Sequence, residues 1–179
     1  QPVCGTTCGL VLDPILLSKM DHPYMDFMLF DAEHGRYDAQ NLVPMLHMCR
    51  MMGLPSIVRI QDAFYHLAAK PLDMGADGIM VGRGALGAPW LPGRISAYLE
   101  TGVDPGEPSV QEKAETVFRH LKRHLDFYGE KNGIRSFRKH LLWYLERFPG
   151  GTEAFRPLSR LSNTSELVSG LSIFLKKTF

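Results

Sequence analysis

The sequence predicts an α/β fold: half of a TIM-type β/α barrel with about four parallel strands, followed by an all-α helical bundle. Early in the chain, short apolar runs without polar alternation are separated by segments of helical periodicity, the pattern of a parallel sheet with crossover helices. After a stretch rich in proline and glycine, only helical periodicity remains. The 179 residues are also too few for a complete barrel, which takes roughly 250 residues, plus a second domain. We therefore expect a partial barrel at 1–102, a linker at 103–108 and a helical domain at 109–179.

Four β-α steps make up the expected partial barrel. The apolar runs that we expect to be strands are residues 9–12, 25–30, 56–59 and 79–81. Asp13 would cap a first helix that runs from Pro14 to about Met20, and Asp38 would open the second helix, which Gly53 ends. Further helices are expected near residues 65–74 and 91–101.

The helical domain is expected to begin at Ser109, a good N-cap residue for a helix that extends to about Tyr128. We expect the glycine-bounded segment 129–133 to end that helix and a second helix to run over 134–147. Two further amphipathic helices, at 152–162 and 165–177, would close a small bundle.

Charge is distributed unevenly, although the net charge is only +1. Residues 1–82 contain five Lys or Arg against nine Asp or Glu, whereas residues 83–179 contain 15 against ten. The second half is therefore the better candidate for a polyanionic partner. Three cysteines without a metal-binding spacing favour a reducing, cytoplasmic setting, and we assign no metal ligands. We expect no contact with a membrane, because no apolar run approaches the roughly 18 residues needed to span one.

Several polar side chains follow the expected strands directly. In a parallel sheet the loops after the carboxyl ends of the strands meet at one rim. We expect this rim to hold Asp31, Glu33, His34, Arg59 and Arg83. For His34 two interpretations stay open, a functional group or a loop histidine bonded to a neighbouring carboxylate.

Glycines surround the end of the fourth expected strand. Gly82-Arg83-Gly84 would let backbone N–H groups approach a bound group closely, and the arginine would add positive charge. This favours a phosphate site, although a glycine turn after a strand is also the usual way for an α/β protein to turn a corner. The stretch 75–90, Gly-Ala-Asp-Gly-Ile-Met-Val-Gly-Arg-Gly-Ala-Leu-Gly-Ala-Pro-Trp, resembles the last barrel strand of the tRNA-dihydrouridine synthase family. The resemblance implies that Gly82, Arg83 and Gly84 hold the phosphate of FMN.

The expected helix 134–147 carries Arg135, Arg138 and Lys139 at i, i+3 and i+4, which places three cations on one face. Such a face is either a solvated helix side or a contact for successive phosphates. The pattern of glycine, cations, aromatic residues and Pro-Gly resembles the tRNA-binding C-terminal domain of the same family; it is formed by Gly133, Arg135, Arg138, Lys139, His140, Trp143, Tyr144, Pro149 and Gly150. The resemblance implies that Arg135, Arg138, Lys139 and His140 contact tRNA.

The resemblance to the synthases implies a flavin-dependent reduction of uridine in tRNA, but it does not extend to the catalytic middle of the barrel. Neither Cys4 nor Cys8 lies in the motif of the family's catalytic cysteine. Where the family has Gly-Asn-Gly after the preceding strand, this chain has Arg59-Ile60-Gln61. We therefore expect tRNA binding with weak or missing catalysis.

Part of the front half, about residues 9–81, resembles the class II pyruvate-dependent (2-oxo-acid) aldolases instead, through Asp31-Ala-Glu-His-Gly35, Val58-Arg59 and the stretch 72–81. That resemblance implies His34 as catalytic base, Arg59 as the residue that binds pyruvate, and a Mg²⁺ or Mn²⁺ ion whose ligands have no counterpart here. The chain thus has the pattern of a join between two families, whether by natural fusion, truncation or engineering.

A half-barrel leaves two sheet edges and an apolar inner face open, and we expect Phe30, Val58 and Met80 on that face. Two copies could close an eight-stranded barrel by two-fold symmetry, so we expect a homodimer through the open half-barrel. Three functions remain after the sequence analysis: a tRNA-binding synthase-like protein, a metal-dependent aldolase, and a non-catalytic scaffold.

Overall fold

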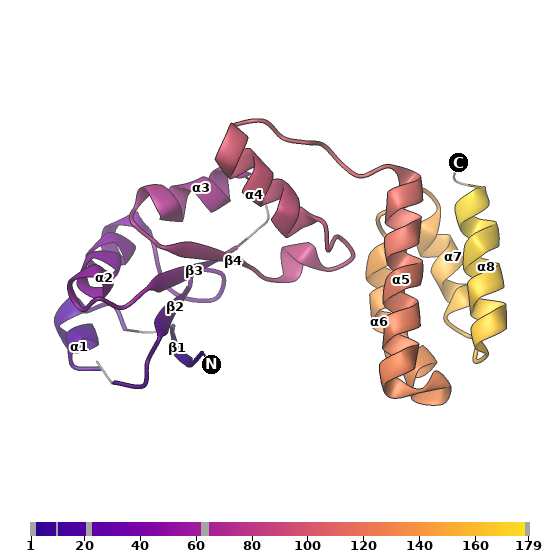
Figure 1. Ribbon diagram of the computed structural model, residues 1–179, viewed down its shortest axis with the longest axis horizontal. Coiled ribbons are helices and arrows are strands. Elements are labelled where there is room, and N and C mark those ends of the chain that lie inside the picture. The colour runs from indigo at the N-terminus through magenta and orange to yellow at the C-terminus, as the bar shows by residue number, and fades with distance from the viewer. Residues whose placement is uncertain (1–2, 10, 21–22, 62–64, 178–179) are drawn as a thin grey trace. The chain divides into compact units, whose positions relative to one another are not determined.

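The computed structural model describes residues 3–9, 11–20, 23–61 and 65–177 (Figure 1). The chain forms two compact units. The sheet unit comprises Gln1–Ala85 and Leu91–Asp104, and the helical unit comprises Leu86–Trp90 and Pro105–Phe179. Among the described helices, none is both long enough and apolar enough to cross a membrane.

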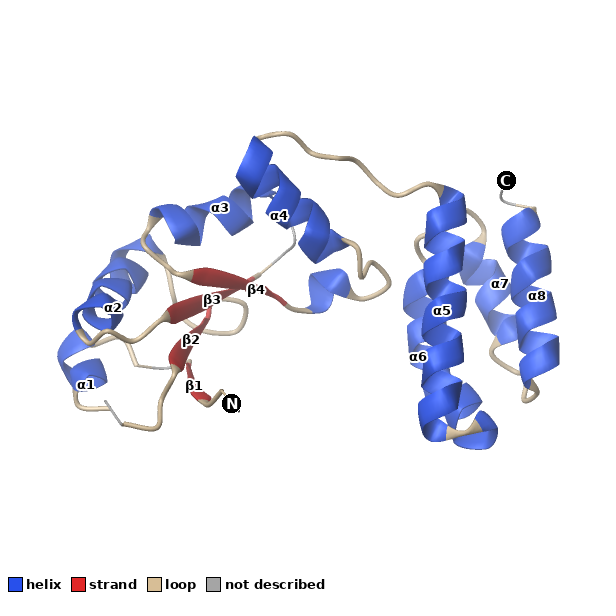
Figure 2. Ribbon diagram, viewed as in Figure 1, coloured by secondary structure: helices blue, strands red, loops and turns tan. Residues whose placement is uncertain are grey.

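The sheet unit is a four-stranded parallel sheet with its strands in the order β1-β2-β3-β4 (Figure 2). The expected α/β half-barrel is therefore confirmed. Its elements are β1 (Gly5–Cys8), α1 (Pro14–Ser18), β2 (Phe27–Asp31), α2 (Ala39–Met51), β3 (Ser56–Ile60), α3 (Tyr65–Asp73), β4 (Gly78–Val81), the 3₁₀ turn η1 (Arg83–Ala85) and α4 (Leu91–Thr101).

The first strand lies earlier than the sequence analysis placed it. Residues 9–12 were expected to form it, but β1 is Gly5–Cys8, which pairs with residues 27–30 of β2. Of the expected stretch, residue 10 lies outside the described residues, and Val11 has no strand partner. The carbonyl of Val11 accepts a hydrogen bond from the Tyr37 hydroxyl at 2.8 Å instead of joining the sheet. The helix caps were predicted correctly: Asp13 accepts from the backbone of α1, and Asp38 caps α2.

The two faces of the sheet differ in what covers them. Alternate residues of β2 and β3 pack beneath the helices, and both Phe30 and Val58 are fully buried there. Met80 lies on the opposite face, in register with Arg59, and is 42% exposed. The prediction that Phe30, Val58 and Met80 share the open inner face is therefore wrong for the first two, because successive side chains of a strand point to opposite faces.

The helical unit consists of α5 (Val110–Tyr128), α6 (Glu130–Leu145), α7 (Gly151–Leu158) and α8 (Thr164–Lys176). Ser109 and Glu112 form a capping box at the start of α5, as the N-cap prediction required. The expected five-residue turn at 129–133 is wrong: Gly129 alone separates α5 from α6, with φ of 73°. A single core cluster that includes Leu121, Phe137 and Leu171 holds the four helices together.

A short segment before α4 belongs to the helical unit. Residues Leu86–Trp90 group with it, and Gly87 lies against the backbone of α6 with φ of 70°. A Cβ atom at Gly87 would lie 2.0 Å from the carbonyl oxygen of Trp143, so no other residue fits this position without displacing the backbone. Arg147 also donates to the Leu86 carbonyl at 3.2 Å. The helical unit is thus built from two separate stretches of the chain.

Candidate functional site

The rim of the sheet unit brings together the five residues that the sequence analysis placed there. Arg59 forms ion pairs with Asp31, at 3.3 Å, and with Glu33. Arg83, from η1, donates to Glu33 Oε1 at 2.6 Å, and its Nη2 lies 3.1 Å from His34 Nε2. The other ring nitrogen of His34 lies 3.3 Å from Asp31 Oδ2. Their expected convergence at the carboxyl ends of the strands is confirmed, and the charges at this rim neutralise one another.

Both carboxylates of the rim stay ionised at neutral pH. Burial alone would raise the pKa of Asp31, but hydrogen bonds from His34 and the Glu33 backbone, together with the charge of Arg59, lower it below the ordinary value. For Glu33, burial likewise opposes ionisation, and the hydrogen bond from Arg83 and the charge of Arg59 outweigh it, so its pKa is lowered too. A ligand that approaches the rim therefore meets two guanidinium groups that already have anionic partners.

The glycine turn after β4 fits one phosphate group in part. The side chain of Arg83 is 67% exposed, and glycine on either side leaves the backbone beside it uncovered. Gly82 has little space: a Cβ atom there would lie 3.0 Å from Arg59 Nε, a buried atom without a hydrogen-bond partner among the described residues. The guanidinium of Arg83 is already paired with the carboxylate of Glu33. A phosphate bound here therefore has to replace Glu33 as the partner of that arginine.

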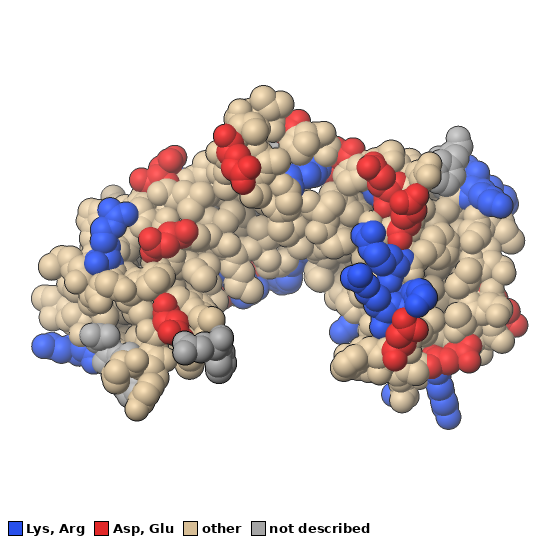
Figure 3. Space-filling model, in the orientation of Figure 1, with Lys and Arg blue, Asp and Glu red and all other residues tan. Residues whose placement is uncertain are grey.

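The cations of α6 contrast with those of the rim. Arg135, Arg138 and Lys139 are exposed, and none of the three forms an ion pair with any described residue. Arg135 and Arg138 border a surface depression of about 370 Å³ that Ser162 also lines. Figure 3 shows further Lys and Arg side chains gathered over α5, whose exposed cations are Arg119, Lys122 and Arg123. A polyanion can meet Arg135, Arg138 and Lys139 without first displacing a carboxylate from them, whereas Lys122 is paired with Asp126 at 3.1 Å.

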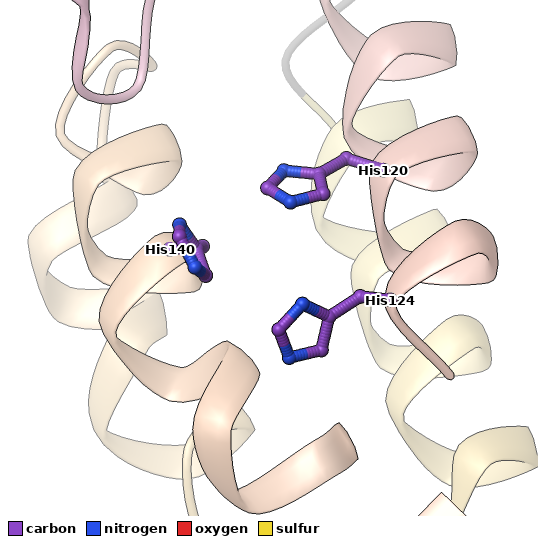
Figure 4. Close-up of side chains that lie close together, drawn as sticks. All are labelled: His120, His124 and His140. Carbon is purple, nitrogen blue, oxygen red and sulfur yellow. The ribbon is translucent and has the colours of Figure 1, made fainter. Parts of the chain in front are cut away.

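The fourth residue that the sequence analysis assigned to RNA binding, His140, lies differently. Its ring projects into the space between α5 and α6, toward His120 and His124 (Figure 4). The sequence analysis did not single out His120 and His124. Their i, i+4 spacing on a helix is the signal that could have found them.

A comparison with protein-family models finds the family described as "Dihydrouridine synthase (Dus)" over residues 57–178, more than half of the chain. The chain belongs to the dihydrouridine synthase family. The matched region begins within β3, so it includes Arg59 as well as the glycine turn and the whole helical bundle. It therefore reaches further toward the N-terminus than the stretch from residue 75 on which the resemblance was based.

Curated relatives carry the same family name. A probable tRNA-dihydrouridine synthase of Rickettsia conorii is 47% identical over 89 residues, which are 50% of this chain and 27% of that protein. The probable tRNA-dihydrouridine synthase of Mycobacterium leprae is 42% identical over 117 residues, 65% of this chain and 29% of that protein. The tRNA-dihydrouridine synthase B of Shewanella oneidensis is 45% identical over 73 residues, 41% and 23% of the two chains. The chain thus spans only about a quarter of the length of these relatives.

Proposed function

We propose that this chain acts in the FMN-dependent reduction of uridine in tRNA, as a tRNA-dihydrouridine-synthase-like protein, and that α6 binds the tRNA. The observation that carries the proposal is a set of three exposed cations on one helix face in a member of this family, Arg135, Arg138 and Lys139, which form no ion pair with a described residue. Side chains without a protein partner are available to phosphate oxygens, and an α-helix brings residues three and four apart onto one side. The expected assignment of His140 to the same contact stays a prediction.

A filter-binding titration with tRNA at several salt concentrations tests this proposal. Neutralised phosphates release counterions, so removing three phosphate contacts lowers the slope of log affinity against log salt by about 2 to 3. We expect this change in the triple variant R135A/R138A/K139A. The matched control is R156A/R160A/K176A, which removes the same charge from exposed positions elsewhere in the helical unit. Equal slopes for the two triple variants would exclude α6 as the specific contact.

We propose further that Gly82, Arg83 and Gly84 bind the phosphate of FMN. When bound, FMN would supply the hydride for the reduction. The guanidinium of Arg83 would bind the phosphate. Its 2.6 Å hydrogen bond to Glu33 competes with that binding. We therefore expect the affinity for FMN to depend on two side chains of opposite charge, Arg83 and Glu33.

Quenching of FMN fluorescence on binding tests the phosphate proposal without any assay of activity. Charge-assisted hydrogen bonds contribute about 1.5 to 3 kcal/mol, so Arg83→Ala should weaken FMN binding at least about tenfold. Glu33→Gln should strengthen binding several-fold, because the phosphate no longer competes with a carboxylate. Arg50→Ala, an exposed arginine on α2, serves as the control that should change little. If Glu33→Gln weakens FMN binding, Glu33 supports the flavin site and our account of it is wrong.

The aldolase interpretation has less support. Its base His34 and its arginine Arg59 do lie at one rim, but Arg59 is engaged by Asp31 and Glu33 and does not offer a free guanidinium to pyruvate. Formation of pyruvate from a 4-hydroxy-2-oxo acid with Mg²⁺ or Mn²⁺, lost in the His34→Ala variant, would revive this function. A non-catalytic scaffold is the remaining alternative, and tRNA binding without flavin binding would favour it.

We also propose that two copies associate through the open face of the sheet. Phe27, Leu29, Ile57 and Met80 line an apolar cavity of about 710 Å³ on this unit, together with residues of α4. Burying such an apolar surface against a second copy removes it from water, which favours association. Sedimentation equilibrium at micromolar concentration should give a dimer, and a 20.1 kDa monomer would exclude it.

We propose a reducing, cytoplasmic setting for the protein, since its three cysteines are free thiols.

A further inference from the structure

Three histidines of the helical unit face one another across two helices. His120 and His124 are one turn apart on α5, and His140 comes from α6 (Figure 4). The two helices approach closely at their connected ends, because Gly133 leaves room for Leu125: a Cβ atom there would lie 2.8 Å from the Leu125 side chain. The spacing along α5 and the pairing of the two helices thus bring the three imidazoles into one space.

The three rings lie nearly as close together as imidazoles that share one metal ion. One ring nitrogen from each histidine lies within 4.8 Å of the other two. The ring centres are 4.8 Å apart for His120 and His140, 5.5 Å for His124 and His140, and 5.9 Å for His120 and His124. With zinc–nitrogen bonds of about 2.0–2.1 Å in tetrahedral directions, the centres of coordinated imidazoles lie roughly 5 Å apart. Small rotations of the side chains therefore suffice to reach ligation geometry.

The hydrogen bonds of His120 and His124 each involve one ring nitrogen, which leaves the other nitrogen of each ring for a metal. The Ser136 hydroxyl donates to the Asn132 carbonyl at 2.8 Å, so it accepts from His124 Nε2 at 2.7 Å and leaves His124 Nδ1 with a free lone pair. The Tyr144 hydroxyl lies 3.0 Å from His120 Nδ1, and when it accepts a hydrogen bond from His120 Nδ1–H, the lone pair of His120 Nε2 is available to a metal. Partners of this kind fix the ring orientation of metal-binding histidines.

The third histidine, His140, also has ring nitrogens available to a metal. Neither nitrogen of His140 has a hydrogen-bond partner among the described residues. Burial lowers the pKa of all three histidines, that of His140 to about 4, and the repulsion between neighbouring cations adds to this effect. A metal ion binds the neutral form of an imidazole.

We propose that His120, His124 and His140 bind one Zn²⁺ ion between α5 and α6. Three neutral imidazoles suit zinc and related transition metals rather than Mg²⁺ or Ca²⁺, which prefer oxygen ligands. A three-histidine site leaves a fourth position for water or another ligand. The ion would tie α5 to the helix that carries Arg135, Arg138 and Lys139. This role is separate from the proposed flavin contact and from the RNA contact of Arg135, Arg138 and Lys139, and it competes with the predicted RNA contact for His140.

The competing explanation is packing, because the ring of His120 makes edge-on contacts with Phe137 and Tyr144. Isothermal titration of untagged, metal-free protein with Zn²⁺ separates the two. We expect one zinc per chain, with affinity reduced at least about 100-fold in His120→Ala and in His140→Ala, and unchanged in His47→Ala, an exposed histidine of α2. Absence of zinc binding at micromolar concentration overturns the proposal.

A second cluster that could hold a metal, formed by Asp31, Glu33 and His34, lies on the rim of the sheet unit. The His34→Ala variant distinguishes the two locations: loss of zinc binding there, with binding retained in His140→Ala, overturns the proposal. A measurement on the unaltered protein covers the case in which a variant fails to fold. Zinc should protect His120, His124 and His140, but not His47, from acylation by diethyl pyrocarbonate. If zinc binds and protects none of the three, the site lies elsewhere.

Discussion

The two units of the protein use their charged side chains differently. At the rim of the sheet unit, Arg59 and Arg83 both form ion pairs with carboxylates at the end of β2 or in the turn that follows it. On α6 of the helical unit, Arg135 and Arg138 have no ion-pair partner among the described residues. Arginine therefore forms internal ion pairs at the rim of the sheet unit, whereas Arg135 and Arg138 on α6 form none with a described residue.

This difference indicates what stabilises each unit. The helical unit depends on an apolar core, on helix caps and on close backbone contacts at Gly87 and Gly151. We expect Arg135, Arg138 and Lys139 to contribute little to its folding, because they form no ion pair with a described residue. The sheet unit also depends on charged hydrogen bonds at its strand ends. Substitutions that separate folding from charge can test this comparison. Both tryptophans, Trp90 and Trp143, lie in the helical unit and all three cysteines lie in the sheet unit. Tryptophan fluorescence and thiol labelling thus report the two units separately.

The largest effect is expected for Phe137→Ala. Phe137 is fully buried in the core of the helical unit, and removing a buried phenylalanine side chain costs about 3 to 5 kcal/mol. Urea denaturation followed by tryptophan fluorescence should show this loss, while labelling of the buried thiols Cys8 and Cys49 stays unchanged. Phe127→Ala is the control, since that ring is 80% exposed and its loss should cost less than about 0.5 kcal/mol. Equal losses in the two variants would mean that the core is not where we place it.

Gly87→Ala should destabilise the helical unit by about 3 kcal/mol, because it combines an unfavourable φ with a clash against the Trp143 carbonyl. Gly150→Ala provides the matched comparison. Gly150 has the same φ of 70°, but no atom of a described residue lies within 4 Å of its added Cβ atom, so only the backbone cost of about 1 kcal/mol remains. The same fluorescence measurement applies. A Gly87→Ala variant no less stable than Gly150→Ala would show that the segment 86–90 does not pack against α6.

In the sheet unit, Asp77→Asn tests the contribution of a charged hydrogen bond. Asp77 accepts from the backbone N–H of the buried Ser56 at 2.8 Å and from its hydroxyl at 3.0 Å. The backbone hydrogen bond is the main reason that the pKa of Asp77 is lowered. We expect a loss of about 1 kcal/mol at pH 7, since the neutral amide accepts a weaker bond.

The sign of the pH effect follows from the direction of that shift. A lowered pKa in the folded state stabilises the protein above the unfolded value, about 3.9, and this stabilisation is lost as pH falls through the folded value. The stability difference between wild type and Asp77→Asn should therefore be constant above about pH 5 and shrink below about pH 4. Labelling of Cys8 and Cys49 with a pyridyl disulfide, which reacts in acid, measures it. A difference that persists undiminished to pH 2 would contradict this account.

The smallest effect on folding is expected for Arg138→Ala, below about 0.5 kcal/mol, because the side chain is exposed and makes no ion pair with a described residue. The same variant should weaken tRNA binding measurably. A loss of more than 1 kcal/mol in the fluorescence measurement would show that the cations of α6 also support the fold, and the contrast between the units would disappear.

The elements predicted well from the sequence are those determined by neighbouring residues. Asp13, Asp38 and Ser109 each cap a helix as expected, because a cap is formed within three residues of the chain. The first strand was misplaced because the outcome depends on a distant contact. The carbonyl of Val11 accepts a hydrogen bond from the hydroxyl of Tyr37, 26 residues later, and no local sequence pattern indicates that hydrogen bond.

The same distinction holds for the candidate sites. The meeting of Asp31, Arg59 and Arg83 was predictable, since parallel strands end at one rim, but their mutual pairing depends on side-chain geometry. The histidine cluster was missed because His140 was grouped with its cationic neighbours. Which way His140 points is determined by its position relative to α5, and a motif read along one helix does not contain that information.

The packing of Gly87 against Trp143 bears on how such a unit can be passed from one protein to another. Because residues 86–90 belong with the bundle, a gene segment that begins at the linker 103–108 would leave part of the bundle's own surface behind in the donor. A segment that begins between Gly82 and Ala85 carries both stretches together. A segment that is to carry the intact helical unit therefore has to begin before Leu86, upstream of the boundary that the proline-rich linker suggests.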